Sequence, residues 1–140
     1  MDVVTLTPAD ADATVALWGA CNLTRPWNDA HADYARALAG PSSTVLGVRD
    51  GEALVGTVMV GGDGHRGWVY YLAADPGRRG EGIGRALMAA AEGWLVAHDL
   101  PKVQFMVRTA NTEVLTFYAR LGYEEQDVVV LGRRLDAPAH

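Results

Sequence analysis

The sequence predicts a single α/β domain over residues 1–140, with a mixed central β-sheet flanked by helices and a frayed tail at residues 136–140. The chain has 140 residues, of which 49% are hydrophobic and 21% charged, and this is the size and composition of one globular domain. Apolar patterns of strand and helical period alternate along it. No repeat, low-complexity tract or linker divides it.

Start and stop signals place the elements along the chain. Thr7 and Pro8 combine a capping hydroxyl with a proline that suits the first helical position, and Asp50-Gly51 tolerates the backbone of a tight hairpin. Pro101 stops one helix, and Gly122 should end another in the left-handed conformation. The expected strands are 3–6, 43–49, 53–60, 68–72, 102–107 and 128–131. The expected helices are 8–20, one that starts near 28 or 29 and stops at 40–41, 82–98 and 111–120.

Two of these helices carry apolar faces that should pack on the sheet. The helix over 8–20 should bury Val15 together with Leu17 or Trp18. The hairpin makes the middle strands antiparallel, while the later strand–helix–strand passages favour parallel neighbours, so the sheet should be mixed. The residues that recur at helical spacing over 82–98 are Ile83, Leu87, Ala90, Ala91 and Trp94.

Bulk properties argue against several classes of protein. The formal net charge of -5 disfavours nucleic-acid binding, because phosphate neutralisation needs a basic face. No apolar run approaches the roughly 20 residues that span a bilayer, and the N-terminus lacks a signal-peptide pattern, so no membrane partner is expected. The single cysteine, Cys21, fits the reducing cytoplasm. His31, His98 and His140 have no clustered ligands, so no metal is expected.

A glycine-rich segment opens the helix expected at residue 82. Gly80, Gly82 and Gly84 would let a pyrophosphate approach the unpaired amides of a helix N-terminus, and Arg78 and Arg79 add two permanent cations. The P-loop lysine is absent, and an arginine replaces the third Rossmann glycine. The alternative is that these glycines only permit a turn and close packing of helix on sheet.

The same segment resembles a family signature. Residues 79–84, Arg-Gly-Glu-Gly-Ile-Gly, are similar to the signature of the GNAT superfamily of acetyltransferases: Gln or Arg, two residues, Gly, one residue, then Gly or Ala. The lead-in over 71–76 and the segment over 111–123, with its asparagine, aromatic–tyrosine pair and closing glycine–tyrosine, are similar to further parts of the family pattern. Short segments at 25–28 and 63–67 resemble the small bacterial YpeA-type branch.

The resemblance implies an acyltransferase that moves an acetyl group from acetyl-CoA to a primary amine, on a protein N-terminus, a lysine or a small molecule. In that family the strand before the turn pairs its backbone with the pantetheine arm, and the turn holds the pyrophosphate. The residues that the resemblance places against acetyl-CoA are Leu72, Ala73, Ala74, Arg79, Gly80, Glu81, Gly82, Ile83, Gly84, Arg85, Asn111 and Tyr118.

Tyr118 is the candidate general acid. Asn111 and Tyr118 are seven residues apart, so on a helix they return to nearly the same face, roughly 10 Å apart along the axis. A phenol within hydrogen-bond reach of the sulfur can protonate the thiolate as it leaves, and the resemblance implies that Asn111 contacts the CoA arm. The alternative is that Phe117 and Tyr118 are core aromatics and that Asn111 only caps the helix, although Asn111 can do both.

The general base is unassigned, because the strand over 68–72 lacks the glutamate that serves as base in many members of the family. Asp63 and His65 could activate the amine, directly or through water, or be polar turn residues. Tyr70 or Tyr71 could shape the acceptor pocket, since neighbouring strand residues face opposite sides. Residues that could form an acidic and aromatic pocket for a cationic amine, or be caps and a solvated helix face, are Trp27, Asn28, Asp29 and Asp33.

The missing base bears on the choice of acceptor. An α-amino group with a pKa of about 8 is substantially neutral near pH 7, whereas a lysine near 10.4 is neutral only about one time in a thousand. We therefore expect acceptors less basic than lysine. The alternative function is a non-catalytic acyl-CoA-binding sensor or partner module, and the chain is expected to be a monomer or a homodimer.

Overall fold

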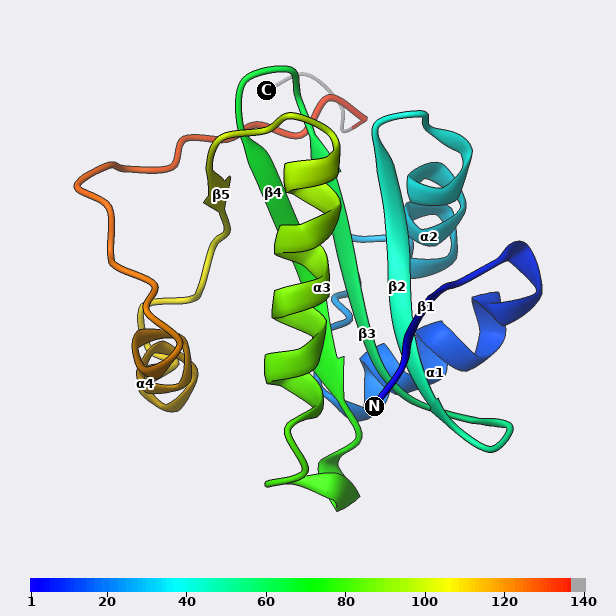
Figure 1. Ribbon diagram of the computed structural model, residues 1–140. Coiled ribbons are helices and arrows are strands. Elements are labelled where there is room, and N and C mark those ends of the chain that lie inside the picture. The colour runs from blue at the N-terminus through cyan, green and yellow to red at the C-terminus, as the bar shows by residue number, and fades with distance from the viewer. Residues whose placement is uncertain (137–140) are drawn as a thin grey trace. The chain divides into compact units, whose positions relative to one another are not determined.

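A computed structural model describes residues 1–136 and divides the chain into two compact units (Figure 1). The first, Met1–Met106, contains a five-stranded sheet and three α-helices. The second begins at Val107 and contains the helix α4, Thr112–Arg120. The α/β fold class is as predicted. The tail predicted over 136–140 lies, apart from Asp136, outside the described residues.

The sheet follows chain order, β1-β2-β3-β4-β5, and is mixed as predicted. Its first three pairings are antiparallel and the pairing of β4 with β5 is parallel. The hairpin forms at the predicted place: Asp50 pairs with Ala53, and Gly51 takes a φ of 62°, which a residue without Cβ adopts readily. The strands are β1 (Val3–Thr5), β2 (Ser43–Asp50), β3 (Ala53–Gly62), β4 (Gly67–Ala74) and β5 (Val103–Gln104).

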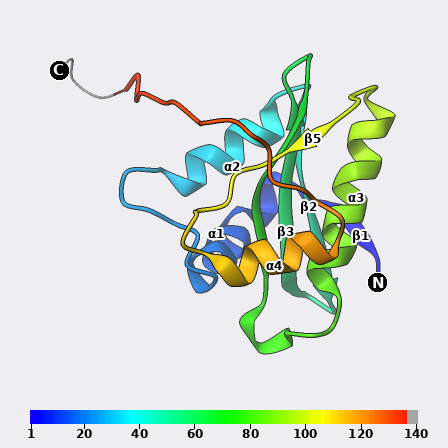
Figure 2. The same ribbon diagram turned by 90° about the vertical axis from the view of Figure 1, so that its left-hand side faces the viewer.

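Helices α1 (Ala11–Ala20) and α2 (Ala30–Ala39) cover one face of the sheet, and α3 (Ile83–Ala97) covers the other (Figure 2). A single 3-10 turn precedes α1, where the Thr7 amide donates to Asp10 Oδ2 at 2.9 Å. Of the apolar residues predicted for α1, Leu17 and Trp18 are buried, and Val15 is half-buried and packs against the same core. The core between the sheet and these two helices consists of Leu6, Leu17, Trp18, Tyr34, Ala37, Val45 and Ala73.

Glycines on the strands allow α3 to lie close against the sheet. A Cβ on Gly56 would stand 2.4 Å from Ile83 Cγ2, and one on Gly67 would stand 2.5 Å from Leu95 Cδ1. Both ends of α3 therefore contact the strand backbone directly. Of the predicted apolar face, Ala90 and Trp94 are only half-buried, and Trp94 stacks on His98 with ring centroids 3.7 Å apart. The buried residues of α3 are Ile83, Leu87, Met88, Ala91 and Leu95.

Two strand predictions were wrong. The strand expected over 102–107 is limited to Val103 and Gln104, because β4 and β5 stop pairing after those two residues. The strand expected over 128–131 does not form: Val129 is 84% and Leu131 90% exposed. A β-branched composition favours extended backbone, but a strand also needs a neighbour for its amides and carbonyls.

Candidate functional site

One edge of β4 is open along most of its length. On the β3 side, pairing continues from Gly67 to Ala74. On the β5 side, only Gly67 and Trp68 have partners. From Val69 to Ala74, no other strand within residues 1–136 pairs with that edge. Unpaired strand backbone is a template for an extended ligand that offers amides and carbonyls of its own.

This open edge includes Leu72, Ala73 and Ala74, the residues predicted to contact the pantetheine arm. Ala73 is buried and pairs with Thr57. The Ala74 carbonyl accepts a hydrogen bond from the Cys21 thiol at 3.2 Å, and burial raises the pKa of that thiol. Cys21 thus remains a protonated donor that fixes the end of β4.

The chain turns from β4 into α3 through two glycines in left-handed conformation. Gly80 has a φ of 83° and Gly82 a φ of 81°, and nothing lies within 4 Å of a Cβ built on either. Gly82 caps α3, whose first hydrogen bond runs from the Ala86 amide to the Gly82 carbonyl at 3.0 Å. Among the described residues, none accepts a hydrogen bond from the amides of residues 79 to 85. Seven consecutive amides, at the positive end of a helix, are therefore available to an anion.

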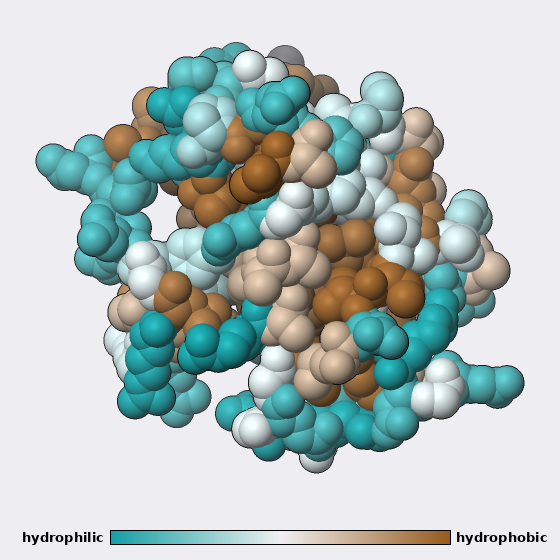
Figure 3. Space-filling view, viewed as in Figure 1, coloured by the Kyte–Doolittle hydropathy of each residue, from teal (hydrophilic) through white to brown (hydrophobic). Residues whose placement is uncertain are grey.

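The two arginines before this turn differ in their surroundings. Arg78 donates to Asp50 Oδ2 at 2.7 Å and lies 3.8 Å from Glu81 Oε1, and the Asp50 carboxylate raises the pKa of its guanidinium. Arg79 is exposed and makes no ion pair with any residue in the described range. Polar residues gather at the lower end of Figure 3, where Figure 1 places the turn. Of the two arginines predicted to bind the anion, only Arg79 is not paired with a carboxylate of the described residues.

In the second unit, α4 and its N-cap residue supply the two other residues predicted to contact acetyl-CoA. Asn111 Oδ1 accepts from the Val114 amide at 3.4 Å and caps the helix, as predicted. Tyr118 is 9% exposed, and the rings of Phe117 and Tyr123 meet it edge-on, with centroids at 5.2 and 5.9 Å. Burial raises the pKa of Tyr118 to about 12, so its phenol carries a proton throughout the neutral range.

Asp63 and His65 lie in the turn before β4, at the opposite end of that strand from the glycines. Asp63 Oδ1 accepts from the amides of His65 and Arg66 at 2.8 and 2.7 Å, and Oδ2 accepts from Trp68 Nε1 at 3.1 Å. These bonds, led by the backbone amides, lower the pKa of Asp63 to about 2. A carboxylate so weakly basic is a poor proton acceptor, and its contacts favour the interpretation as a polar turn residue.

Residues predicted to shape an acceptor pocket differ in exposure. Trp27 is 55% and Tyr70 45% exposed. Asn28 lies in the turn before α2, where its amide donates to the Arg25 carbonyl at 3.1 Å, and Asp29 caps α2 by accepting from the Ala32 amide at 3.0 Å. Asp29 therefore acts as a helix cap, which is the alternative to an acidic pocket that the sequence left open.

Strand β4 has an irregularity at Tyr71 that was not predicted from the sequence. Thr57 pairs with Ala73 but Met59 pairs with Tyr70, so Tyr71 and Leu72 together face a single residue of β3. Tyr71 takes a φ of 53°. Such a β-bulge with a left-handed residue is usually marked by glycine or asparagine, and a Tyr-Tyr pair carries no such mark.

Two kinds of structural feature are absent from residues 1–136. No group of three or more His, Cys, Asp or Glu side chains in that range is arranged to hold a metal ion. None of the helices described there combines the length and the apolar character needed to cross a bilayer.

Comparison with known proteins identifies the family. Residues 11–123 match the model of the acetyltransferase (GNAT) family. The chain is 41% identical over 135 residues to Acetyltransferase YE1169 of Yersinia enterocolitica, covering 96% of each chain. Its fold is similar to that of a putative acetyltransferase from Agrobacterium tumefaciens, with a TM-score of 0.80 at 20% identity over 96% of this chain and 100% of that one. It is also similar to AAC(6')-Iy in complex with a CoA-based bisubstrate analogue, with a TM-score of 0.81 at 17% identity over 95% and 97%. The chain therefore belongs to the GNAT family of acetyltransferases.

Proposed function

We propose that this acetyltransferase moves the acetyl group of acetyl-CoA directly onto a primary amine that is less basic than lysine. The observation that carries the proposal is the continuity of two features of the first unit. The open β4 edge over 69–74 leads, through Asp75 and one 3-10 turn, into the amides of residues 79 to 85 that have no acceptor. An extended pantetheine arm ending in a pyrophosphate matches that sequence of groups.

Each part of the donor has a partner in this arrangement. The backbone of Leu72, Ala73 and Ala74 pairs with the amides and carbonyls of the pantetheine arm. The amides of Gly80 through Arg85, among them Glu81, Ile83 and Gly84, donate to the pyrophosphate, and Arg79 neutralises part of its charge. Asn111, the N-cap of α4, binds the CoA arm through its side-chain NH2 group, because the Val114 amide uses only its Oδ1.

The reaction is an acyl transfer with one bond formed and one broken. The neutral amine attacks the thioester carbonyl, a C–N bond forms, and the C–S bond breaks as CoA leaves. The nitrogen loses one proton to solvent, and the sulfur gains one from Tyr118, which recovers its proton from solvent after turnover. Tyr118, whose pKa of about 12 keeps it protonated, donates to the sulfur as negative charge develops there. Positioning of donor and amine supplies much of the rate.

We propose an acceptor amine of low basicity because β4 carries no glutamate that could act as a strong base. With Asp63 held at a pKa of about 2, no carboxylate of that turn competes for the proton of an ammonium ion. An amine with a pKa of about 8 attacks without such help, whereas lysine presents its neutral form about one time in a thousand. Trp27, Asn28, His65 and Tyr70 remain our candidates for contacts with the acceptor. The segments at 25–28 and 63–67 support our proposal that the chain belongs to the YpeA-type branch.

The test is release of free CoA thiol in the presence of α-amino compounds, lysine peptides, amino sugars and other small amines. We expect turnover with low-pKa amines and acetyl-CoA binding detected as thermal stabilisation. The variant Tyr118→Phe should still bind acetyl-CoA but lose about 100-fold or more of its turnover. Tyr123→Phe removes a neighbouring phenol and should keep wild-type turnover.

Two results would contradict the proposal. Turnover with lysine peptides but with no low-pKa amine would refute the proposal that the acceptor is less basic than lysine. Binding of acetyl-CoA without thiol release, for every amine tried, would instead support a sensor or partner module.

A further inference from the structure

Tyr71 combines an unfavourable backbone conformation with contacts that hold it there. Its φ of 53° is rare for a bulky residue and persists only where the surroundings determine it. It lies in the bulge of β4, directly before Leu72, Ala73 and Ala74. The conformation of Tyr71 therefore sets the direction in which the backbone of those three residues points.

The ring and the carbonyl of Tyr71 are held by two buried residues. The indole of Trp18, on α1, stacks on the phenol ring with centroids 3.8 Å apart and planes 7° from parallel. Trp18 Nε1 donates to Thr57 Oγ1 at 2.9 Å, and the same hydroxyl donates to the Tyr71 carbonyl at 3.3 Å. Trp18 and Thr57 have no exposed surface. Ring and backbone of Tyr71 are thus linked through one closed set of contacts.

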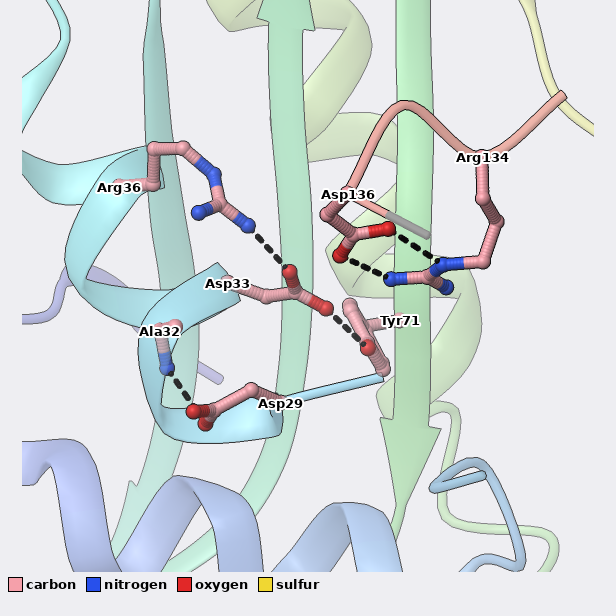
Figure 4. Close-up of polar contacts among 7 residues, drawn as sticks. All are labelled: Asp29, Ala32, Asp33, Arg36, Tyr71, Arg134 and Asp136. Atoms are coloured by element: carbon pink, nitrogen blue, oxygen red, sulfur yellow. Dashed lines mark hydrogen bonds and ion pairs between the residues drawn. The ribbon is translucent and has the colours of Figure 1, made fainter. Parts of the chain in front are cut away.

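The hydroxyl of Tyr71 is held from a third side, by α2. It donates to Asp33 Oδ2 at 2.8 Å, and Asp33 Oδ1 accepts from an Arg36 nitrogen at 2.6 Å (Figure 4). Each carboxylate oxygen of Asp33 therefore already accepts a hydrogen bond from its own fold. Burial first, and then Asp33, raise the pKa of Tyr71 to about 12, so the phenol remains a donor at neutral pH.

From these contacts we propose that Asp33 is a positioning residue: through Tyr71 it fixes the β4 bulge from which Leu72, Ala73 and Ala74 present their backbone to acetyl-CoA. The inference rests on the proposed function, because it assigns the donor to that edge. It gives Asp33 a role different from binding a cationic acceptor. Loss of the Tyr71–Asp33 bond lets the ring and the strained backbone relax together, and the donor-binding groups lose their alignment.

The experiment compares four variants in acetyl-CoA affinity by calorimetry, in KM and kcat with an accepted amine, and in amide hydrogen exchange over 72–74. Tyr71→Phe and Asp33→Ala remove the bond, while Asp33→Asn keeps an oxygen that accepts it. Tyr34→Phe is the matched control: it deletes a buried phenol that donates to the Thr7 carbonyl at 2.6 Å and touches the same Trp18, but not the bulge.

We expect Tyr71→Phe and Asp33→Ala to raise the Kd of acetyl-CoA about fivefold to tenfold, the factor that one lost hydrogen bond produces, and to speed exchange of the Leu72–Ala74 amides. Asp33→Asn should restore most of the affinity. Tyr34→Phe should lower the melting temperature without changing Kd or exchange at those amides.

Three results would overturn the inference. Unchanged acetyl-CoA affinity in Tyr71→Phe and Asp33→Ala, with or without faster exchange, would leave Asp33 a structural residue only. A raised KM for the amine alone would make Asp33 an acceptor-binding residue. If the wild-type chain itself binds no acetyl-CoA, the proposed function fails first and the inference fails with it, and the wild-type titration distinguishes that case from the other two.

Discussion

Replacement of Gly56 by alanine should move the start of α3 and weaken both stability and donor binding. The added Cβ would lie 2.4 Å from Ile83 Cγ2 and 2.9 Å from Leu87 Cδ1, about 1 Å inside normal contact. Ile83 cannot rotate away, because a β-branched side chain in a helix keeps essentially one rotamer. The helix itself must therefore shift, and the glycine turn that precedes it shifts too.

The magnitude follows from overpacking. Such substitutions cost about 1–3 kcal/mol. With an unfolding entropy of about 2.1 cal/mol/K per residue and 140 residues, a loss of about 2 kcal/mol lowers the melting temperature by about 7 °C. Thermal unfolding followed by circular dichroism, with and without acetyl-CoA, measures both this loss and the expected smaller stabilisation by the donor.

Gly93→Ala provides the control on the same helix. Gly93 is exposed, and nothing lies within 4 Å of a Cβ built on it, so alanine should stabilise α3 by about 0.5–1 kcal/mol and leave donor binding unchanged. The melting temperature of Gly56→Ala could instead stay at the wild-type value, or rise as that of Gly93→Ala is expected to. Either result would contradict the close packing of α3 on Gly56 and its effect on the glycine turn.

Three further predictions concern other parts of the site. Arg79→Gln should raise the Kd of acetyl-CoA about tenfold at low salt and less at high salt, whereas Arg78→Gln should change it little, since Asp50 holds Arg78; equal effects in calorimetry would contradict this. Tyr118→Phe should lower kcat with little change in acetyl-CoA affinity, and unchanged kcat would remove Tyr118 as the acid. The fold lowers the pKa of Asp63 from 3.8 to about 2, so its stabilisation is complete above about pH 4 and lost as the pH falls towards 2. Asp63→Asn should flatten the melting temperature against pH in that window, and an unaltered profile would refute the assignment.

Turns and helix caps could be predicted from the sequence, because they depend on the backbone preferences of single residues. The hairpin at Asp50-Gly51, the cap at Asn111 and the left-handed Gly122 each follow from one residue's backbone preference, and the structure has all three. The turn into α3 was predictable for the same reason, because glycine tolerates the left-handed backbone that Gly80 and Gly82 adopt.

Features set by partners distant in the chain could not be predicted. Nothing in residues 102–107 shows that β4 and β5 separate after Gln104, because that depends on the paths of both strands. The alternation of strand residues placed Tyr70 and Tyr71 on opposite sides, but the bulge breaks that alternation through contacts with Trp18, Asp33 and Thr57. Such contacts become visible only once the fold has brought α1, α2 and β3 together.

Binding of acetyl-CoA along β4 and the glycine turn can be followed by amide NMR, in a titration of the isotope-labelled chain with acetyl-CoA. We expect the largest shifts on the amides of Leu72 to Ala74 and of Gly80 to Arg85, with slowed hydrogen exchange at both segments in the complex. The absence of binding, or shifts that leave both segments unchanged while appearing elsewhere, would contradict this mode of binding.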